Sequence, residues 1–213
     1  MTTHNIIIPK TARYAMLGQM SEHTTDVWFV VHGYGQLAPF FIKKFEAILN
    51  NNTVIIAPEA LSRFYMEGFT GRVGATWMTR EERQSEITDY VNYLNLVYDT
   101  VLENTDVSKI KIHVLGFSQG TTTVCRWLMN AHARFDKLIL WAGYFGNGIE
   151  DVLSPDLVTQ KEVHFVYGNQ DEFLSKIDTM AYEQNLTKNI PNIKIRTFEG
   201  GHSIPIDELK AMV

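Results

Sequence analysis

The sequence predicts a single α/β domain over residues 1–213, built on a mostly parallel central sheet with an antiparallel N-terminal hairpin and helices on both faces. Three observations predict it. Several apolar runs are continuous, which is typical of strands covered on both faces. Segments with helical periodicity alternate with those runs. The sequence Gly-Phe-Ser-Gln-Gly, at 116–120, joins one such run directly to a helix.

The N-terminal segment supplies the antiparallel part of the prediction. Residues 5–8 and 13–18 suit two short strands separated by Pro9 and Lys10. Strands and helices then alternate along the rest of the chain. The expected strands are 26–31, 53–57, 109–115, 137–142, 162–167 and 192–198, and the expected helices are 38–49, 79–103, 121–131, 175–189 and 204–212.

Residues 58–79 interrupt this alternation and are expected to form a loop. The segment is rich in aromatic residues, among them Tyr65, Phe69 and Trp77, and contains three glycines. Long loops without secondary structure are uncommon unless they are functional. We therefore expect these side chains to line a substrate cleft, with an aromatic plug over a sheet edge as the alternative.

Composition narrows the class of protein. The net charge of −5 provides no broad basic face for nucleic acid. No apolar stretch is long enough for a membrane span, and the N-terminus lacks the pattern of a signal peptide. The lone cysteine, Cys125, has no internal disulfide partner. The expectation is a cytoplasmic protein that does not insert stably into a membrane.

Ser118 is the candidate nucleophile. A serine in a tight turn between strand and helix adopts strained backbone angles, and small neighbours such as Gly116 and Gly120 make room for that turn. The turn exposes the serine hydroxyl and directs the backbone N–H of Gln119 toward an oxyanion formed there. An ordinary loop between strand and helix is the alternative.

A serine hydroxyl needs a base, usually a histidine oriented by a carboxylate. Among seven histidines, His202 follows the last expected strand in a glycine-rich loop, which suits a general base. Asp171 follows the preceding expected strand and is the candidate acid; Glu172 is adjacent, and Asp178 falls in the next expected helix. The order serine, aspartate, histidine is associated with one hydrolase architecture.

A second oxyanion donor is expected from the loop that follows residues 26–31. That loop reads His32-Gly33-Tyr34-Gly35, so the Tyr34 N–H would join the Gln119 N–H. His32 is better suited to organise this loop through hydrogen bonds than to act as a base.

These motifs, in order and along nearly the whole chain, resemble the phospholipase/carboxylesterase branch of the α/β-hydrolases, which includes acyl-protein thioesterases. The resemblance implies a compact enzyme without a large cap domain that needs no cofactor or metal. It implies Ser118 as nucleophile, Asp171 as acid and His202 as base, and Trp77 beside the acyl site. The chain departs from the pattern at Gln36, where an aspartate is usual, and after Asp171, where a proline is usual.

The predicted function is therefore hydrolysis of a small-molecule carboxylic ester or thioester through an acyl-enzyme intermediate, as in a serine carboxylesterase. A peptidase, a lactone or carbohydrate-ester hydrolase, and a catalytically silent binding module are the alternatives. The sequence leaves open the acyl chain, the leaving group and whether the chain forms a homodimer. It also leaves open whether an arginine near the expected cleft contacts an anionic substrate; the candidates are Arg63, Arg72, Arg80 and Arg83.

Overall fold

A seven-stranded sheet forms the centre of the protein. The computed structural model describes residues 1–213, and the strands of this sheet are β1 (Tyr14–Leu17), β2 (Asp26–Val31), β3 (Thr53–Pro58), β6 (Lys111–Phe117), β7 (Lys137–Trp141), β8 (Glu162–Gly168) and β9 (Ile193–Phe198). Their order is β1-β3-β2-β6-β7-β8-β9. β1 runs antiparallel to β3, and every other neighbouring pair is parallel. The predicted mostly parallel sheet is confirmed.

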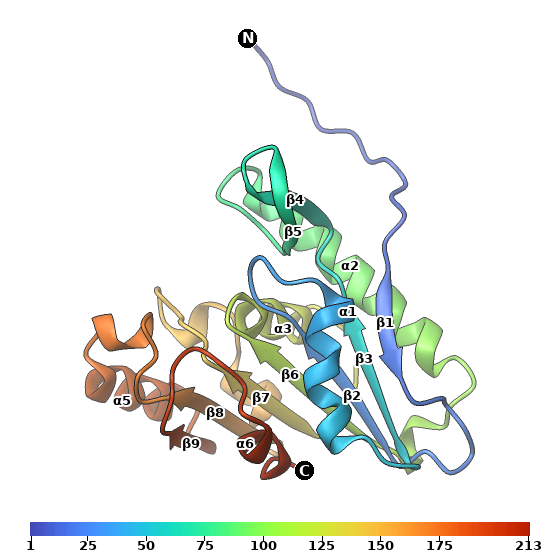
Figure 1. Ribbon diagram of the computed structural model, residues 1–213, viewed down its shortest axis with the longest axis vertical. Helices are drawn as coiled ribbons and strands as arrows, with labels where there is room; N and C mark the ends of the chain where they lie inside the picture. The colour runs from blue at the N-terminus through green and yellow to red at the C-terminus, as the bar shows by residue number, and fades with distance from the viewer.

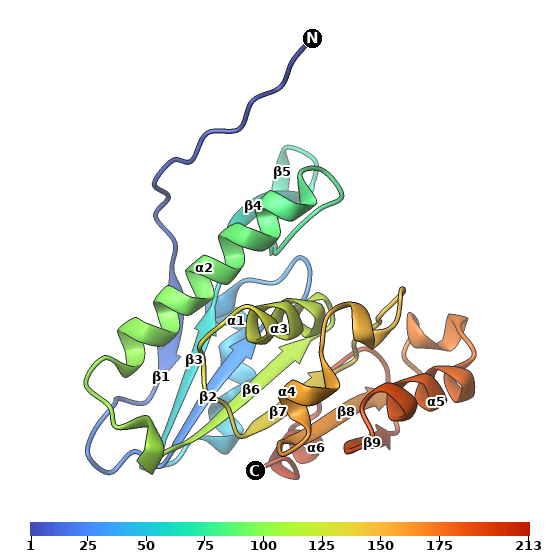
Figure 2. The same cartoon turned by 180° about the vertical axis from the view of Figure 1, so that it is seen from behind.

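Helices cover both faces of the sheet, as predicted. One face carries α2 (Arg83–Leu102), α3 (Gln119–Met129), α4 (Pro155–Val158) and α5 (Thr179–Asn189), and the other carries α1 (Ala38–Phe41), a 3-10 segment (Ile42–Ile48) and α6 (Ile206–Lys210). Figures 1 and 2 show the two layers from opposite sides. Each layer buries its own apolar cluster against the sheet. No helix is both long and apolar enough to cross a membrane.

The N-terminal hairpin that the sequence predicted is absent. β1 supplies the antiparallel edge, but residues 1–13 have no regular secondary structure and Ile6, Ile7 and Ile8 are exposed. An apolar, β-branched run forms a strand only where a partner strand and a surface to pack on are available. In Figure 1 this segment projects away from the sheet.

The expected loop at 58–79 is largely an antiparallel hairpin of β4 (Ser62–Glu67) and β5 (Thr70–Thr76). The glycines of this segment predicted irregular structure. In the fold they instead allow two backbone segments to approach closely. A Cβ atom on Gly74 would lie 2.7 Å from the Cα of Gly35. An isolated bridge between Gln36 and Ala75 adds to this contact. The hairpin therefore packs its base against the loop that follows β2.

Several helices begin later than their periodicity predicted. α2 begins at Arg83, because Glu82 has left-handed backbone angles (φ 46°) and the side chain of Glu86 accepts hydrogen bonds from Thr79. α5 begins at Thr179, with the Asp178 side chain accepting from the N–H of Ala181 as its N-cap. The expected helix 38–49 is mostly a 3-10 segment.

Candidate active site

Ser118 occupies the sharp turn between β6 and α3. Its backbone angles, φ 53° and ψ −118°, are unusual for a residue with a side chain. The turn is possible because its neighbours are glycines. A Cβ on Gly116 would collide with the carbonyl of Gly120, and one on Gly120 would collide with the carbonyl of Val31. The structure thus has the local geometry that the Gly-x-Ser-x-Gly motif predicts.

Asp171 and His202 are joined by a hydrogen bond at the carboxyl edge of the sheet. His202 Nδ1 lies 2.7 Å from Asp171 Oδ2. Asp171, in the turn after β8, is 1 % exposed, and its Oδ1 accepts hydrogen bonds from the N–H groups of Phe173 (2.9 Å) and Leu174 (3.2 Å). Three donors, these two N–H groups and His202 Nδ1, therefore satisfy the hydrogen-bonding needs of the buried carboxylate.

The His202 ring lies beside the turn that carries Ser118. It packs against Phe117, the residue before Ser118, at a centroid distance of 4.9 Å, and against Phe173 at 4.7 Å. Neither Ser118 Oγ nor His202 Nε2 is hydrogen bonded to another protein group, so both atoms are free to bind a substrate or each other. Serine–histidine hydrogen bonds are often long before substrate binds.

The alternative acids are placed elsewhere. The Glu172 carboxylate is exposed and accepts a hydrogen bond of 3.4 Å from the backbone N–H of His202, not from its ring. Asp178 caps α5. Of these three carboxylates, only that of Asp171 is hydrogen bonded to the imidazole of His202.

The two predicted oxyanion donors belong to segments that adjoin Ser118. A Cβ on Gly33 would be 3.0 Å from Cβ of Ser118, so the loop after β2 runs directly past the serine. The Tyr34 N–H has no hydrogen-bond partner within the protein. Gln119 is the first residue of α3, where no intrahelical acceptor is available to the backbone N–H. Both N–H groups are thus free to bind an anion.

His32 organises this loop. Its Nδ1–H donates to the carbonyl of Gly33 (2.8 Å), and its Nε2 accepts from the N–H of Ala60 (3.0 Å). This pattern requires a neutral imidazole. Burial lowers the pKa of His32 to about 4, against opposing effects of the Gly33 carbonyl and the Glu59 charge. The side chain of Gln36 completes the loop by accepting from the Gly33 N–H at 2.8 Å.

The side chain of Gln119 has a role that the sequence analysis missed. Its Oε1 accepts from the N–H of Trp77 (3.1 Å), and its Nε2 donates to Thr76 Oγ1 (3.0 Å) and to the carbonyl of Met78 (3.0 Å). These partners lie more than forty positions away in the sequence, at the end of β5. No local pattern could have indicated them.

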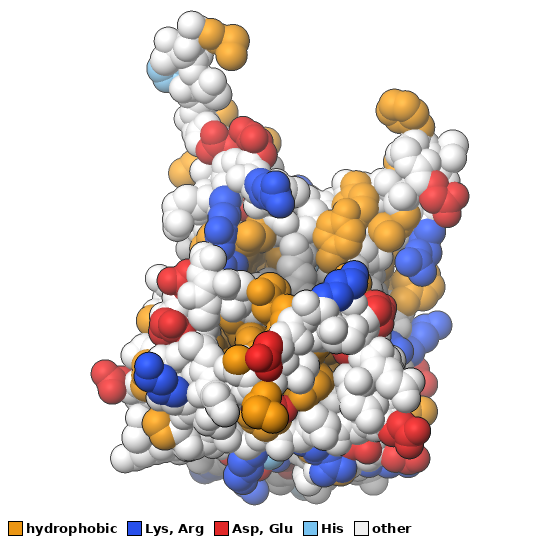
Figure 3. Space-filling model, turned by 90° about the vertical axis from the view of Figure 1, so that its left-hand side faces the viewer, with side chains coloured by type: hydrophobic (Ala, Val, Ile, Leu, Met, Phe, Trp, Pro, Cys, Tyr) orange, Lys and Arg blue, Asp and Glu red, His pale blue; other side chains and the backbone are white.

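The three expected substrate-binding aromatics are not grouped on a cleft wall. Trp77 is 2 % exposed, and its indole donates to the carbonyl of His32 at 2.8 Å. Tyr65 is 53 % exposed on β4, and Phe69 is 95 % exposed at the hairpin turn. Figure 3 shows two projections at the top of the molecule, where Figures 1 and 2 place the hairpin and the N-terminal segment. Trp77 supports the loop after β2 from below.

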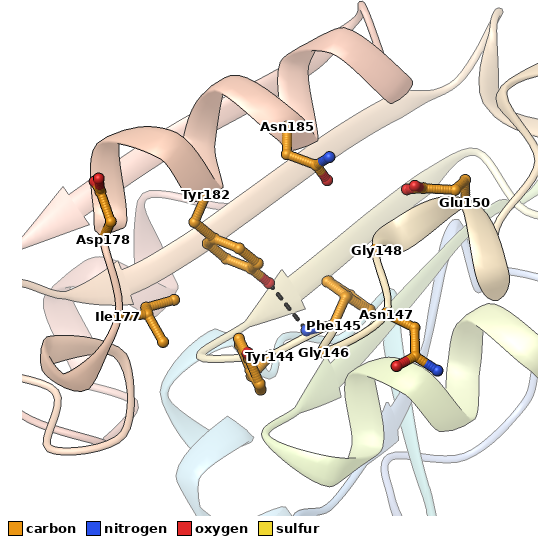
Figure 4. Close-up of a pocket in the computed structure, with 10 residues that line it drawn as sticks. All are labelled: Tyr144, Phe145, Gly146, Asn147, Gly148, Glu150, Ile177, Asp178, Tyr182 and Asn185. Atoms are coloured by element: carbon orange, nitrogen blue, oxygen red, sulfur yellow. Dashed lines mark hydrogen bonds between the residues drawn. The ribbon is translucent and has the colours of Figure 1, made fainter.

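Two cavities flank residues 144–148, the loop after β7. The first has a volume of about 330 Å³ and lies between this loop and the start of α5, where the N–H of Phe145 donates to Tyr182 Oη at 3.2 Å (Figure 4). The second has a volume of about 270 Å³ and reaches Met78 and Thr122. We call this second one the α3 cavity. No group of three or more His, Cys, Asp or Glu side chains is arranged to hold a metal ion.

A strained serine between strand and helix, an oriented histidine–aspartate pair, and free backbone N–H groups beside the serine define a serine hydrolase with the α/β-hydrolase fold. The chain belongs to the family described as Serine hydrolase (FSH1), whose model matches residues 23–212. The predicted resemblance to an α/β-hydrolase family is thereby confirmed. No curated protein sequence matches the chain significantly.

Solved structures of hydrolases share this fold. Acyl-protein thioesterase 2 from Zea mays is similar with a TM-score of 0.69 and 14% sequence identity, covering 95% of this chain and 96% of that one. A phospholipase/carboxylesterase from Dyadobacter fermentans is similar with a TM-score of 0.66 and 16% identity, covering 98% and 97%. The Bacillus cereus carboxylesterase has a TM-score of 0.63 and 12% identity, covering 94% and 91%. At these identities the likeness concerns the fold.

Proposed function

We propose that this serine hydrolase cleaves small-molecule carboxylic esters or thioesters through an acyl-enzyme intermediate on Ser118. The observation that carries the proposal is the 2.7 Å hydrogen bond between His202 and a buried Asp171, with the imidazole packed beside the strained serine. We include in the proposal that the whole chain acts as one catalytic domain. We further propose a cytoplasmic location, which the single, buried and unpaired Cys125 supports.

The proposed reaction has two steps. His202 Nε2 takes the proton of Ser118 while Oγ attacks the carbonyl carbon, and the N–H groups of Tyr34 and Gln119 bind the resulting oxyanion. Asp171 keeps the Nδ1–H of His202 in place and stabilises the imidazolium. The tetrahedral intermediate collapses as His202 protonates the departing alcohol or thiol. Water, deprotonated by the same nitrogen, then attacks the acyl-enzyme and releases the acid and free Ser118.

The experiment compares wild type with Ser118→Ala on a short-chain p-nitrophenyl ester and the matching thioester. Wild type should turn over at least one of them and should be labelled at Ser118 by a fluorophosphonate. The alanine variant should fold, remain unlabelled and lose nearly all turnover, because the nucleophile is absent. An unreactive Ser118 in folded wild type, or full activity in the alanine variant, would refute the proposal. Parallel assays with peptide and lactone substrates identify the acyl compound preferred.

A further inference from the structure

The α3 cavity contains two arginines that have no carboxylate partner. Arg83, the first residue of α2, and Arg126, on α3, both line it. Neither forms an ion pair, and the one hydrogen bond of the Arg126 guanidinium is to Met78 Sδ, a weak acceptor, at 3.3 Å. By contrast, Arg63 is paired with the buried Glu59 at 2.7 Å. Two cations therefore face a cavity with unfilled donor capacity.

The α3 cavity lies next to the turn that carries the nucleophile, although Ser118 itself is not part of its wall. Met78 and Thr122 line it, and both are hydrogen bonded to Gln119, the residue after Ser118. Thr122 and Arg126 follow Ser118 by one and two helical turns, so they lie on the same side of α3. A long side chain on a helix points toward the N-terminal end. In agreement with this tendency, the Arg126 guanidinium contacts Met78, whose carbonyl accepts a hydrogen bond from the side chain of Gln119.

The location of the cavity assigns it to the acyl part of a substrate. The leaving group departs on the side of His202, which protonates it, and that ring is packed between Phe117 and Phe173. Neither phenylalanine nor His202 lines the α3 cavity. Apolar side chains in the wall, Phe145 and Val152 among them, suit a short carbon chain between the scissile carbonyl and the arginines.

Other polar and charged groups near the α3 cavity reduce the positive charge of the two arginines but do not cancel it. Asp151 is the one acidic residue in the wall, against two arginines. The hydroxyl of Tyr90 is buried and has no hydrogen-bond partner. Burial raises the pKa of Tyr90, and the nearby Arg126 guanidinium, followed by the charge of Arg83, opposes that shift. The local balance is positive although the net charge of the protein is −5.

We propose that the α3 cavity binds a carboxylate at the far end of the acyl chain, so that the enzyme prefers half-esters or half-thioesters of short dicarboxylic acids over those of monocarboxylic acids. The recognition is a charge-assisted hydrogen bond from Arg126, supported by the charge of Arg83. This inference rests on the proposed function and adds its substrate class.

The test compares two esters that differ only at the end of the acyl chain, 4-methylumbelliferyl hemi-adipate and 4-methylumbelliferyl hexanoate. Wild type should prefer the hemi-adipate in kcat/KM by about ten-fold or more, because hydrogen bonds to charged groups have effects of that size. Arg126→Gln should lower this preference about ten-fold. Asp151→Asn should increase it, since the acidic residue opposes an anionic acyl chain. Arg80→Gln removes an exposed arginine outside the cavity and should leave the preference for the hemi-adipate unchanged.

A binding measurement makes the result independent of turnover. Calorimetry on Ser118→Ala should show tighter binding of monomethyl adipate than of methyl hexanoate, and Ser118→Ala/Arg126→Gln should lose that difference. Equal kcat/KM or equal binding for the two acyl chains, or a preference that Arg126→Gln leaves intact, overturns the inference while the esterase proposal stands. Failure of the esterase proposal is recognised separately, as an unreactive Ser118 in wild type.

Discussion

The side chain of Gln119 joins the turn that carries the nucleophile to the end of β5, because its Oε1 accepts the backbone N–H of Trp77 at 3.1 Å. Its Nε2 bonds to the carbonyl of Met78 at 3.0 Å. The same residue provides one proposed oxyanion donor through its backbone. Gln119 therefore links the position of that donor to the position of the β4–β5 hairpin.

Removing this link should damage both structure and activity. In Gln119→Met the Trp77 N–H loses its acceptor in a buried environment, which costs about 1–3 kcal/mol in the free energy of unfolding. We expect kcat for a reactive ester to fall about ten-fold, since the donor loses its support. Urea unfolding and steady-state kinetics measure the two effects. Thr123→Val is the control, because its hydroxyl bonds within α3, to the carbonyl of Gln119. Equal effects of the two variants would contradict this role.

The bond between Asp171 and His202 predicts a large effect of a small chemical change. Asp171→Asn keeps the shape of the side chain but removes the charge that stabilises the imidazolium and selects the Nδ1–H tautomer. We expect kcat to fall by about 10³-fold or more. Glu172→Gln, at the exposed neighbouring position, should lower kcat by less than about three-fold. If Glu172→Gln proved the more damaging variant, the assignment of the acid would be wrong.

The strained backbone of Ser118 predicts a gain in stability when it is relieved. Glycine adopts φ 53°, ψ −118° without the steric cost that alanine retains. Ser118→Gly should therefore be about 1–2 kcal/mol more stable to urea than Ser118→Ala, although both lack the nucleophile. A Ser118→Gly variant less stable than Ser118→Ala would contradict strain in this turn, because glycine by itself costs about 0.5–1 kcal/mol through the freedom of the unfolded chain.

His32 predicts how stability depends on pH. Its folded pKa of about 4 lies below the ordinary value of 6.5. The folded state thus binds this proton less readily than the unfolded state, so the contribution is fully present above pH 6.5 and lost as pH falls toward 4. The shift corresponds to about 3 kcal/mol. His32→Gln should be less stable at pH 7 and should lose less stability than wild type between pH 6.5 and 4.

The control for this measurement is His23→Gln, since the His23 side chain is 77% exposed. Its stability should follow the wild-type pH curve. A His32→Gln curve parallel to that of wild type over the same interval would contradict the assignment of a buried neutral imidazole.

The sequence predicted those features that depend on local pattern. Buried parallel strands produce continuous apolar runs, so the sheet could be derived without coordinates. Ser118, Asp171 and His202 each follow a strand, and the carboxyl ends of parallel strands share an edge, which brought two of them into contact and the third beside them. Their chemical roles remain predictions.

Features that depend on distant partners could not be derived. The bonds of Gln119 and the acceptor role of Gln36 exist because other segments happen to pass nearby. Residues 5–8 have strand-like composition but no partner, and composition alone does not reveal that. The glycines of the 58–79 segment suggested a loop, whereas Gly74 is there because another backbone lies against it. Arg126 belongs to no motif, so its position at the α3 cavity became visible only in the fold.

The two ends of the β4–β5 hairpin tolerate change very differently. Nothing lies within 4 Å of a Cβ on Gly68 at the tip, whereas at Gly74 even a methyl group collides with Gly35. The neighbouring exposed residue Phe69 can therefore change without disturbing the residues next to Ser118, whereas the positive φ of Gly68 (71°) favours glycine at that one position. The tip of the β4–β5 hairpin can thus be lengthened, or its exposed residues replaced, while the catalytic residues at its base stay the same.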